Sequence, residues 1–183
     1  MVYHLPCPLP PCYQASPTLQ LDSQRGIIHP MRIAIGSDHA GFILKEEIVN
    51  FLAKKNFEFK DFGTLTPDPI DYPEIGTQVA EAVTNGEFDC GILVCGSGIG
   101  MSITANKVPG IRAALCGDTF CARFSRIHND ANILVLGERV TGVGIALDVV
   151  ETWLSTEYPG EERHANRIRK IAEVEKKFSK GGI

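Results

Sequence analysis

The sequence lacks several features that would assign a function at once. It has no apolar run long enough to span a membrane. It has no excess of positive charge either, because 18 Lys and Arg residues stand against 22 Asp and Glu residues, for a net charge of −4 at pH 7. That balance gives no general attraction to nucleic acid. We therefore expect neither a membrane nor a nucleic acid as a partner.

Cysteines in a metal-binding pattern are also missing. The six cysteines form three pairs with a spacing of five residues, at positions 7 and 12, 90 and 95, and 116 and 121. None belongs to a Cys-x-x-Cys motif, and no histidine lies at zinc-finger spacing from a pair. If Cys90 and Cys95 share a strand, their odd separation points them to opposite faces. We expect a reduced, intracellular protein with free thiols and no metal.

The first 30 residues differ in composition from the remainder. They hold six of the eleven prolines and no charged side chain before Asp22. They lack the basic start and apolar centre of a signal peptide, and the single Arg25 does not make a transit peptide. We expect residues 1–30 to be a disordered, Pro-rich leader, and residues 31–183 to form a single domain. Since Met31 opens the first clear strand, translation from an upstream start codon is one hypothesis for this leader.

From Met31 onward, short apolar segments alternate with helical patterns. Helices are expected to begin near residues 44, 75, 101, 119, 145 and 161. In the first of them, Lys45 falls on the charged face. The segment 57–62 alternates apolar and charged residues, which is typical of a strand near a sheet edge. Strands are expected at 32–36, 57–62, 91–95, 111–115 and 131–136.

Five strands that alternate with helices predict a parallel sheet covered on both faces. Right-handed crossovers then favour a doubly wound topology. The predicted fold class is α/β, a three-layer α/β/α sandwich with a five-stranded, parallel, Rossmann-like sheet.

The centre of this pattern is the stretch 91–100, Gly-Ile-Leu-Val-Cys-Gly-Ser-Gly-Ile-Gly. A buried strand ends at Cys95, and a glycine loop leads into a helix. Such a loop lets backbone N–H groups approach an anion, and the field at a helix start stabilises a thiolate. The glycine spacing does not fit a dinucleotide site, and no Walker-type lysine follows it. The local pattern alone leaves open whether Cys95 is reactive or a small core residue.

Other polar residues follow strand ends and are expected at the same sheet edge as Cys95. They are Asp38, His39, Ser97 and Arg139. Arg163 and Arg167 are four residues apart, so on a helix they could clamp one phosphate or simply pair with nearby glutamates. A thiol, a glycine cradle and cationic groups suit proton movement on a small phosphorylated carbonyl compound.

Many ordered motifs of this sequence closely resemble those of the type B ribose-5-phosphate isomerases, whose wider family includes allose- and galactose-6-phosphate isomerases. The resemblance covers residues 31 to about 178, and the leader lies outside it. The motifs are Ile-Gly-Ser-Asp-His-Ala-Gly-Phe (35–42), Asp-Tyr-Pro (71–73), Leu-Val-Cys-Gly-Ser-Gly-Ile-Gly (93–100), Ala-Asn-Lys (105–107), His-Asn-Asp-Ala-Asn (128–132), Gly-Glu-Arg-Val (137–140) and Arg-His-Ala-Asn-Arg (163–167).

The resemblance implies an aldose-ketose isomerase that interconverts D-ribose 5-phosphate and D-ribulose 5-phosphate through an enediolate. This reaction belongs to the non-oxidative branch of the pentose phosphate pathway, in the cytoplasm, and needs no cofactor. Cys95 is implied as the base that moves the proton between C1 and C2, and His128 as the residue that aids ring opening. One branch of the family uses a Glu just after the glycine loop; here that position holds Met101, which indicates the cysteine branch.

The resemblance also implies roles for the other site residues. Asp38 and Asn129 would lie beside the sugar, the Ser97 hydroxyl would assist proton transfer, and Tyr72 would lie near the substrate. The anion hole would be the backbone of Gly96, Ser97, Gly98, Ile99 and Gly100. The phosphate or the sugar end would contact His39, Arg139, Arg163 and Arg167.

The same resemblance implies a homodimer, or a tetramer of two dimers, with His128 and Arg139 reaching the site from the partner subunit. Alternatives remain for the function. A non-catalytic sugar-phosphate binder on the same fold would predict a damaged base or ring-opening residue, and a nucleotide-binding regulator is disfavoured by the glycine spacing. Within the enzyme class, a six-carbon sugar phosphate is the competing substrate.

Overall fold

A single parallel sheet forms the centre of the protein. The computed structural model describes residues 19–22 and 27–179 of the chain. The sheet has five strands in the order β4-β3-β5-β7-β6, and all neighbouring pairs are parallel. The predicted five-stranded parallel sheet is thereby confirmed. The strands are β3 (Arg32–Ser37), β4 (Glu58–Asp61), β5 (Cys90–Cys95), β6 (Ala113–Leu115) and β7 (Ile133–Gly137).

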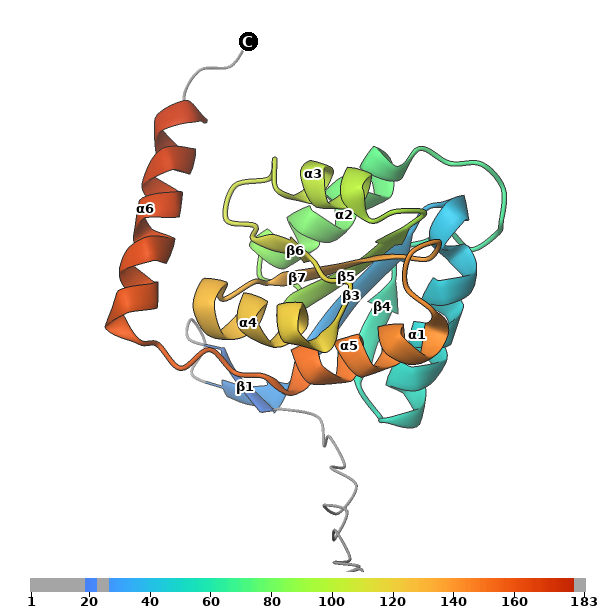
Figure 1. Cartoon of the computed structure of the whole chain (residues 1–183), viewed down its shortest axis with the longest axis horizontal. Helices are drawn as coiled ribbons and strands as arrows, with labels where there is room; N and C mark the ends of the chain where they lie inside the picture. The colour runs from blue at the N-terminus through green and yellow to red at the C-terminus, as the bar shows by residue number, and fades with distance from the viewer. Residues whose placement is uncertain (1–18, 23–26, 180–183) are drawn as a thin grey trace, which may run out of the picture.

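Helices cover both faces of this sheet, as Figure 1 shows. On one face, α1 (Phe42–Lys54), α4 (Thr119–Asn129) and α5 (Val143–Ser155) pack over a core that includes Leu44 and Trp153. On the other face, α2 (Tyr72–Thr84) and α3 (Ile99–Ala105) pack over a core that includes Val79 and Met101. The predicted three-layer sandwich is confirmed.

The central strand β5 shows why the sequence forms these layers. All six of its residues are buried, as expected for a strand with helices on both sides. Cys90 belongs to the core under α5 and Cys95 to the core under α2 and α3, so the prediction that the two thiols face opposite ways is confirmed. Cys90, Cys95, Cys116 and Cys121 are free thiols, whereas Cys7 and Cys12 lie outside the described residues.

Several element boundaries differ from the predicted ones. Strand β6 begins at Ala113 rather than near 111, because the backbone N–H of Arg112 donates to Asn132 Oδ1 at 2.8 Å instead of to a strand. Helix α2 begins at Tyr72 rather than near residue 75, since Pro73 fits the first turn of a helix, where no N–H is needed. The prediction that 57–62 forms an edge strand is confirmed by β4.

The N-terminal segment contains two short strands that the sequence did not predict. Strands β1 (Leu19–Asp22) and β2 (Ile27–Pro30) pair as an antiparallel two-stranded sheet, so the prediction of disorder is wrong for these eight residues. Five of the six prolines in residues 1–30 lie before Leu19, and the sixth, Pro30, is the last residue of β2. The remaining part of the predicted leader, residues 1–18 and 23–26, lies outside the described residues.

Helix α6 (Glu162–Phe178) stands away from the sandwich and contacts it near α4 (Figure 1). Among its residues only His164 is buried. Ile171, Val174 and Phe178 are exposed apolar residues on this helix, so the helix presents apolar surface that its own chain does not cover. In the described part of the chain, no helix has the length and apolar character needed to cross a membrane.

Candidate active site

The glycine loop after β5 holds the sulfur of Cys95. Cys95 ends the strand, and the backbone N–H of Gly98 donates a hydrogen bond to its Sγ at 3.1 Å. Gly98 has φ 80°, and a Cβ there would lie 2.3 Å from a methyl group of Leu115 and 3.1 Å from the carbonyl of Leu136. Only glycine fits this backbone conformation and this close approach. The loop therefore aims a backbone donor at the sulfur.

The other described cysteines are in settings that disfavour a thiolate. Burial raises the pKa of Cys90 to about 12, and burial likewise raises the pKa of Cys116 to about 11. The pKa of Cys121 is also raised, through desolvation and then its hydrogen bond with Asp118. Cys95 differs from them in having its sulfur on a backbone donor within the glycine loop.

Asp38 and His39 lie at the same sheet edge as Cys95. The Asp38 backbone N–H donates to the carbonyl of Val94 at 3.3 Å, and its Oδ1 accepts from the Ala40 N–H at 3.0 Å. The carboxylate is thus fixed next to the end of β5. His39 Nδ1 lies 3.4 Å from the backbone of Ile70, in the loop before α2.

Arg139 lies on its own chain's glycine loop. Its backbone N–H donates to the Gly96 carbonyl at 2.9 Å, and its side chain passes 3.6 Å from the position that a Cβ on Gly96 would take. The neighbouring Glu138 N–H donates to the Cys95 carbonyl at 2.9 Å. The expectation that Arg139 reaches the site from a partner subunit is therefore wrong, since β7 delivers it directly beside Cys95 in the same chain.

Two further predicted residues complete this edge. The Tyr72 ring packs against Gly100, where a Cβ would approach the ring to 2.7 Å. Ser97 Oγ accepts from the Ile99 N–H at 3.3 Å. The structure thus gathers around the loop the following predicted residues: Asp38, His39, Tyr72, Cys95, Gly96, Ser97, Gly98, Ile99, Gly100 and Arg139.

The remaining predicted residues lie at the opposite end of the sheet. His128 and Asn129 are in the last turn of α4, and the Asn129 carbonyl accepts from Arg112 Nε at 2.9 Å, just before β6. The nearby Asn132 carbonyl accepts from the N–H of Gly91, at the start of β5. Because β5 then runs about 13 Å to Cys95, one chain does not bring His128 to its own Cys95.

His128 belongs to a second cluster, between α4 and α6. Its ring lies between those of Phe124, at a centroid distance of 4.7 Å, and His164, at 4.2 Å. Arg163 Nη2 lies 3.1 Å from His164 Nε2, and the charge of Arg167 also acts on His164. His128, Asn129, Arg163 and Arg167 thus form one group of predicted residues, separate from the Cys95 loop.

Sequence reasoning assigned no role to His164. It is buried and its Nδ1 has no hydrogen-bond partner among the described residues. Desolvation lowers its pKa, followed by the positive charge of His128 and of Arg163. Its place inside the Arg-His-Ala-Asn-Arg motif was the available signal. The two glutamates that could have paired with the arginines contact other residues: Glu162 pairs with Arg169 at 3.2 Å, and Glu161 lies 3.7 Å from His164.

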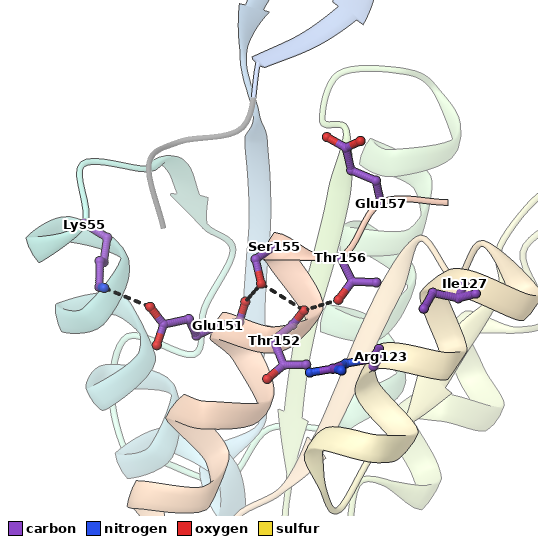
Figure 2. Close-up of a pocket in the computed structure, with 8 residues that line it drawn as sticks. All are labelled: Lys55, Arg123, Ile127, Glu151, Thr152, Ser155, Thr156 and Glu157. Carbon is purple, nitrogen blue, oxygen red and sulfur yellow. Dashed lines mark hydrogen bonds and ion pairs between the residues drawn. The ribbon is translucent and has the colours of Figure 1, made fainter. Parts of the chain in front are cut away.

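Hollows on the surface do not by themselves locate this site. The largest of those described, of about 790 Å³, lies between the ends of α1, α4 and α5. Figure 2 shows that it is lined by the ion pair of Lys55 with Glu151, at 2.8 Å, and by polar side chains such as Thr152. A smaller hollow, of about 350 Å³, is lined by His39 and the acidic residues Asp71 and Glu74. Of these two, the smaller includes a predicted site residue, and a further hollow of about 240 Å³ includes Asn129.

Comparison with known proteins identifies what the chain is similar to. The family model described as Ribose/Galactose Isomerase matches residues 33–171. Ribose-5-phosphate isomerase B of Escherichia coli is 47% identical over 146 residues, which are 80% of this chain and 97% of that protein.

Solved structures give the same result. The ribose-5-phosphate isomerase B of Clostridium thermocellum has a TM-score of 0.79 and 59% identity, covering 81% of this chain and 99% of that one. A third relative is the ribose-5-phosphate isomerase B of Mycoplasma genitalium with bound ribulose-5-phosphate. It has a TM-score of 0.76 and 38% identity, covering 80% of this chain and 97% of that one.

Proposed function

The chain belongs to the ribose/galactose isomerase family, and on this premise we propose that it interconverts D-ribose 5-phosphate and D-ribulose 5-phosphate. The family is one of isomerases, and the relatives above carry this substrate in their names. The observation that carries the proposal is the hydrogen bond from the Gly98 N–H to Cys95 Sγ, in the glycine loop that leads from β5 into α3.

The first step is the opening of the furanose ring of ribose 5-phosphate. The anomeric hydroxyl loses its proton, the C1–O4 bond breaks, O4 gains a proton, and C1 becomes an aldehyde. His128 acts as the general base that takes the proton from the anomeric hydroxyl and as the general acid that gives a proton to O4. Asp38 and Asn129 hold the sugar hydroxyls. The hydrogen bond that fixes the orientation of the Asp38 carboxylate supports this role for Asp38.

The second step moves a proton between carbons. The Cys95 thiolate takes the proton from C2, the electron pair forms the C1–C2 double bond, and the negative charge moves to O1. The N–H groups of the loop 96–100 stabilise this enediolate. The Ser97 hydroxyl relays the O2 proton to O1, and the Cys95 thiol then protonates C1 while O2 becomes the ketone oxygen. No cofactor enters this sequence.

The phosphate requires cationic groups. Arg163 and Arg167 lie one turn apart on α6, and both are exposed, which suits a two-sided clamp on a phosphate. His39 and Arg139 lie at the Cys95 end and would contact the sugar or its phosphate from the other side. Together these residues favour a small, phosphorylated sugar over a neutral one.

The two groups of site residues lie at opposite ends of one sheet, which supports a homodimer as part of this proposal. In a symmetric dimer, the His128 group of each subunit can meet the Cys95 group of the other. Exposed apolar residues border both groups, as a shared interface requires: Ile99, Ile103 and Leu115 near Cys95, and Ile171 and Val174 on α6. Two such dimers would give a tetramer.

Because the substrates are intermediates of the pentose phosphate pathway, we place the enzyme in the cytoplasm.

The test is the rate of ribose 5-phosphate isomerisation by the purified protein and by Cys95→Ala, with allose 6-phosphate and galactose 6-phosphate as further substrates. The proposal predicts turnover of ribose 5-phosphate and a fall of at least about a thousandfold in the folded Cys95→Ala variant. Preference for a six-carbon substrate would change the substrate and keep the reaction. Inactivity on all three would favour a non-catalytic sugar-phosphate binder.

A further inference from the structure

The His128 ring is held between two aromatic rings. His164 stacks on it almost in parallel, with centroids 4.2 Å apart and an interplanar angle of 12°. Phe124 also contacts the His128 ring, at 4.7 Å and 47°, and Phe120 packs against Phe124 at 4.4 Å. The two histidines come from different helices, α4 and α6. The stack therefore ties the end of the helix that carries His128 to the helix that carries Arg163 and Arg167.

The contacts of His164 define its protonation. A guanidinium can only donate hydrogen bonds, so the 3.1 Å contact between Arg163 Nη2 and His164 Nε2 makes Nε2 the acceptor. The ring proton is then on Nδ1, which is buried without a partner among the described residues. The lowered pKa of His164, caused first by desolvation and then by His128 and Arg163, agrees with a neutral ring.

From this geometry we propose that His164 is a positioning residue that holds the His128 imidazole in place for ring opening by stacking on it. The inference rests on the proposed function and adds to it a residue that does not touch the substrate. A neutral ring is required for this role, because a protonated His128 can stack on a neutral imidazole, whereas two stacked imidazolium ions would repel.

Placement of the His128 ring affects ring opening more than it affects the proton transfer between C1 and C2. Ring opening depends on a proton that His128 delivers to O4, and a general acid loses its effect when it is displaced. Proton transfer at carbon depends on Cys95, whose sulfur is held by the Gly98 N–H and not by the His128 stack. Ribulose 5-phosphate cannot close a furanose ring, because its O5 is phosphorylated. Its C1 proton can therefore exchange with solvent through the enediolate without ring opening.

Two variants separate the ring of His164 from its nitrogen atoms. His164→Phe keeps an aromatic face for stacking and loses the acceptor for Arg163. His164→Asn keeps a polar group that can accept from Arg163 and loses the ring. Arg169→Ala is the matched control on α6, since Arg169 is exposed and contacts only Glu162 and Asn166 among the contacts described.

Each protein is assayed in D₂O for two rates: conversion of ribose 5-phosphate to ribulose 5-phosphate, and deuterium uptake at C1 of ribulose 5-phosphate. For His164→Asn we expect conversion to fall about tenfold or more, with C1 exchange within about twofold of wild type. His164→Phe should retain most of the conversion rate, and Arg169→Ala should match wild type. The ratio of the two rates does not depend on the fraction of protein that is folded. If His164→Phe fails to fold, the result for His164→Asn alone therefore decides the test.

Two results would overturn the inference. A parallel fall of both rates in His164→Asn would show a merely structural role. Retained conversion in His164→Asn with loss in His164→Phe would assign the role to the hydrogen bond with Arg163 instead of the stack. Failure of the proposed function would look different, because the wild type would then show neither conversion nor exchange.

Discussion

At the scale of single residues, the reactivity assigned to Cys95 depends on the backbone of Gly98. The Gly98 N–H donates to the sulfur at 3.1 Å only because the residue adopts φ 80° between Leu115 and Leu136. Cys90 lies on the same strand as Cys95, has no such donor among the described residues, and has a pKa raised to about 12 by burial. Two cysteines five residues apart thus have different surroundings, and the difference comes from the glycine loop.

Gly98→Ala should damage both stability and activity. The added Cβ meets Leu115 and the carbonyl of Leu136, and the positive φ is strained for any residue with a Cβ. We expect a loss of about 1–3 kcal/mol in the free energy of unfolding and a fall in kcat of about tenfold or more, because the N–H moves away from the sulfur and from the enediolate. Urea unfolding and steady-state kinetics measure the two effects.

Gly117→Ala is the control for this substitution. Gly117 follows β6, is exposed, and a Cβ there would meet nothing within 4 Å. It should behave as wild type in both assays. If Gly98→Ala also unfolds and turns over like wild type, the backbone donor is not needed for the chemistry.

At the scale of helices and strands, the periodicity of the sequence was enough to predict the sandwich. Every predicted strand of the sheet is present, because a short apolar run bounded by glycine or polar residues most readily forms a buried strand. Boundaries and individual faces were less predictable. Lys45 was expected on the exposed face of α1, yet it is fully buried, because a carboxylate from another element, Asp61 of β4, lies there to pair with it. Such long-range pairing leaves no local signal.

Lys45 should accordingly be a large contributor to the docking of α1 on β4. Its Nζ pairs with Asp61 and with Glu46, the latter at 2.9 Å. Lys45→Met would leave the Asp61 carboxylate without its partner, and we expect a loss of about 3 kcal/mol in the free energy of unfolding. Chemical denaturation of the purified variant measures this loss.

Lys55→Met provides the comparison. Lys55 pairs with Glu151 at 2.8 Å, but both side chains are about one-third exposed (Figure 2). Removing such a pair should cost less than about 1 kcal/mol. Equal losses of unfolding free energy in the two variants would mean that burial does not determine how much the Lys45 ion pair contributes to stability.

At the scale of the whole molecule, the candidate site divides into two groups that one chain keeps apart. Strand ends predicted the group around Cys95 correctly, since parallel strands place their carboxyl ends at one edge. His128 lies at the other edge because α4 runs back along the sheet before β7. His164 was missed because its burial depends on how α6 meets α4, a contact between separate helices that periodicity does not encode.

The arrangement of these two groups gives the most direct test of the account. Cys95→Ala and His128→Ala should each be nearly inactive as purified proteins, because each removes one group from every site. After the two inactive variants are unfolded together and refolded, about half of the dimers should be mixed, and each mixed dimer has one site with both residues intact.

The measurement is the rate of ribose 5-phosphate isomerisation by this mixture. The account predicts recovery of about a quarter of the wild-type activity, with each variant refolded alone remaining inactive. A mixture that forms mixed dimers and stays as inactive as its components would contradict a site built from Cys95 of one subunit and His128 of the other.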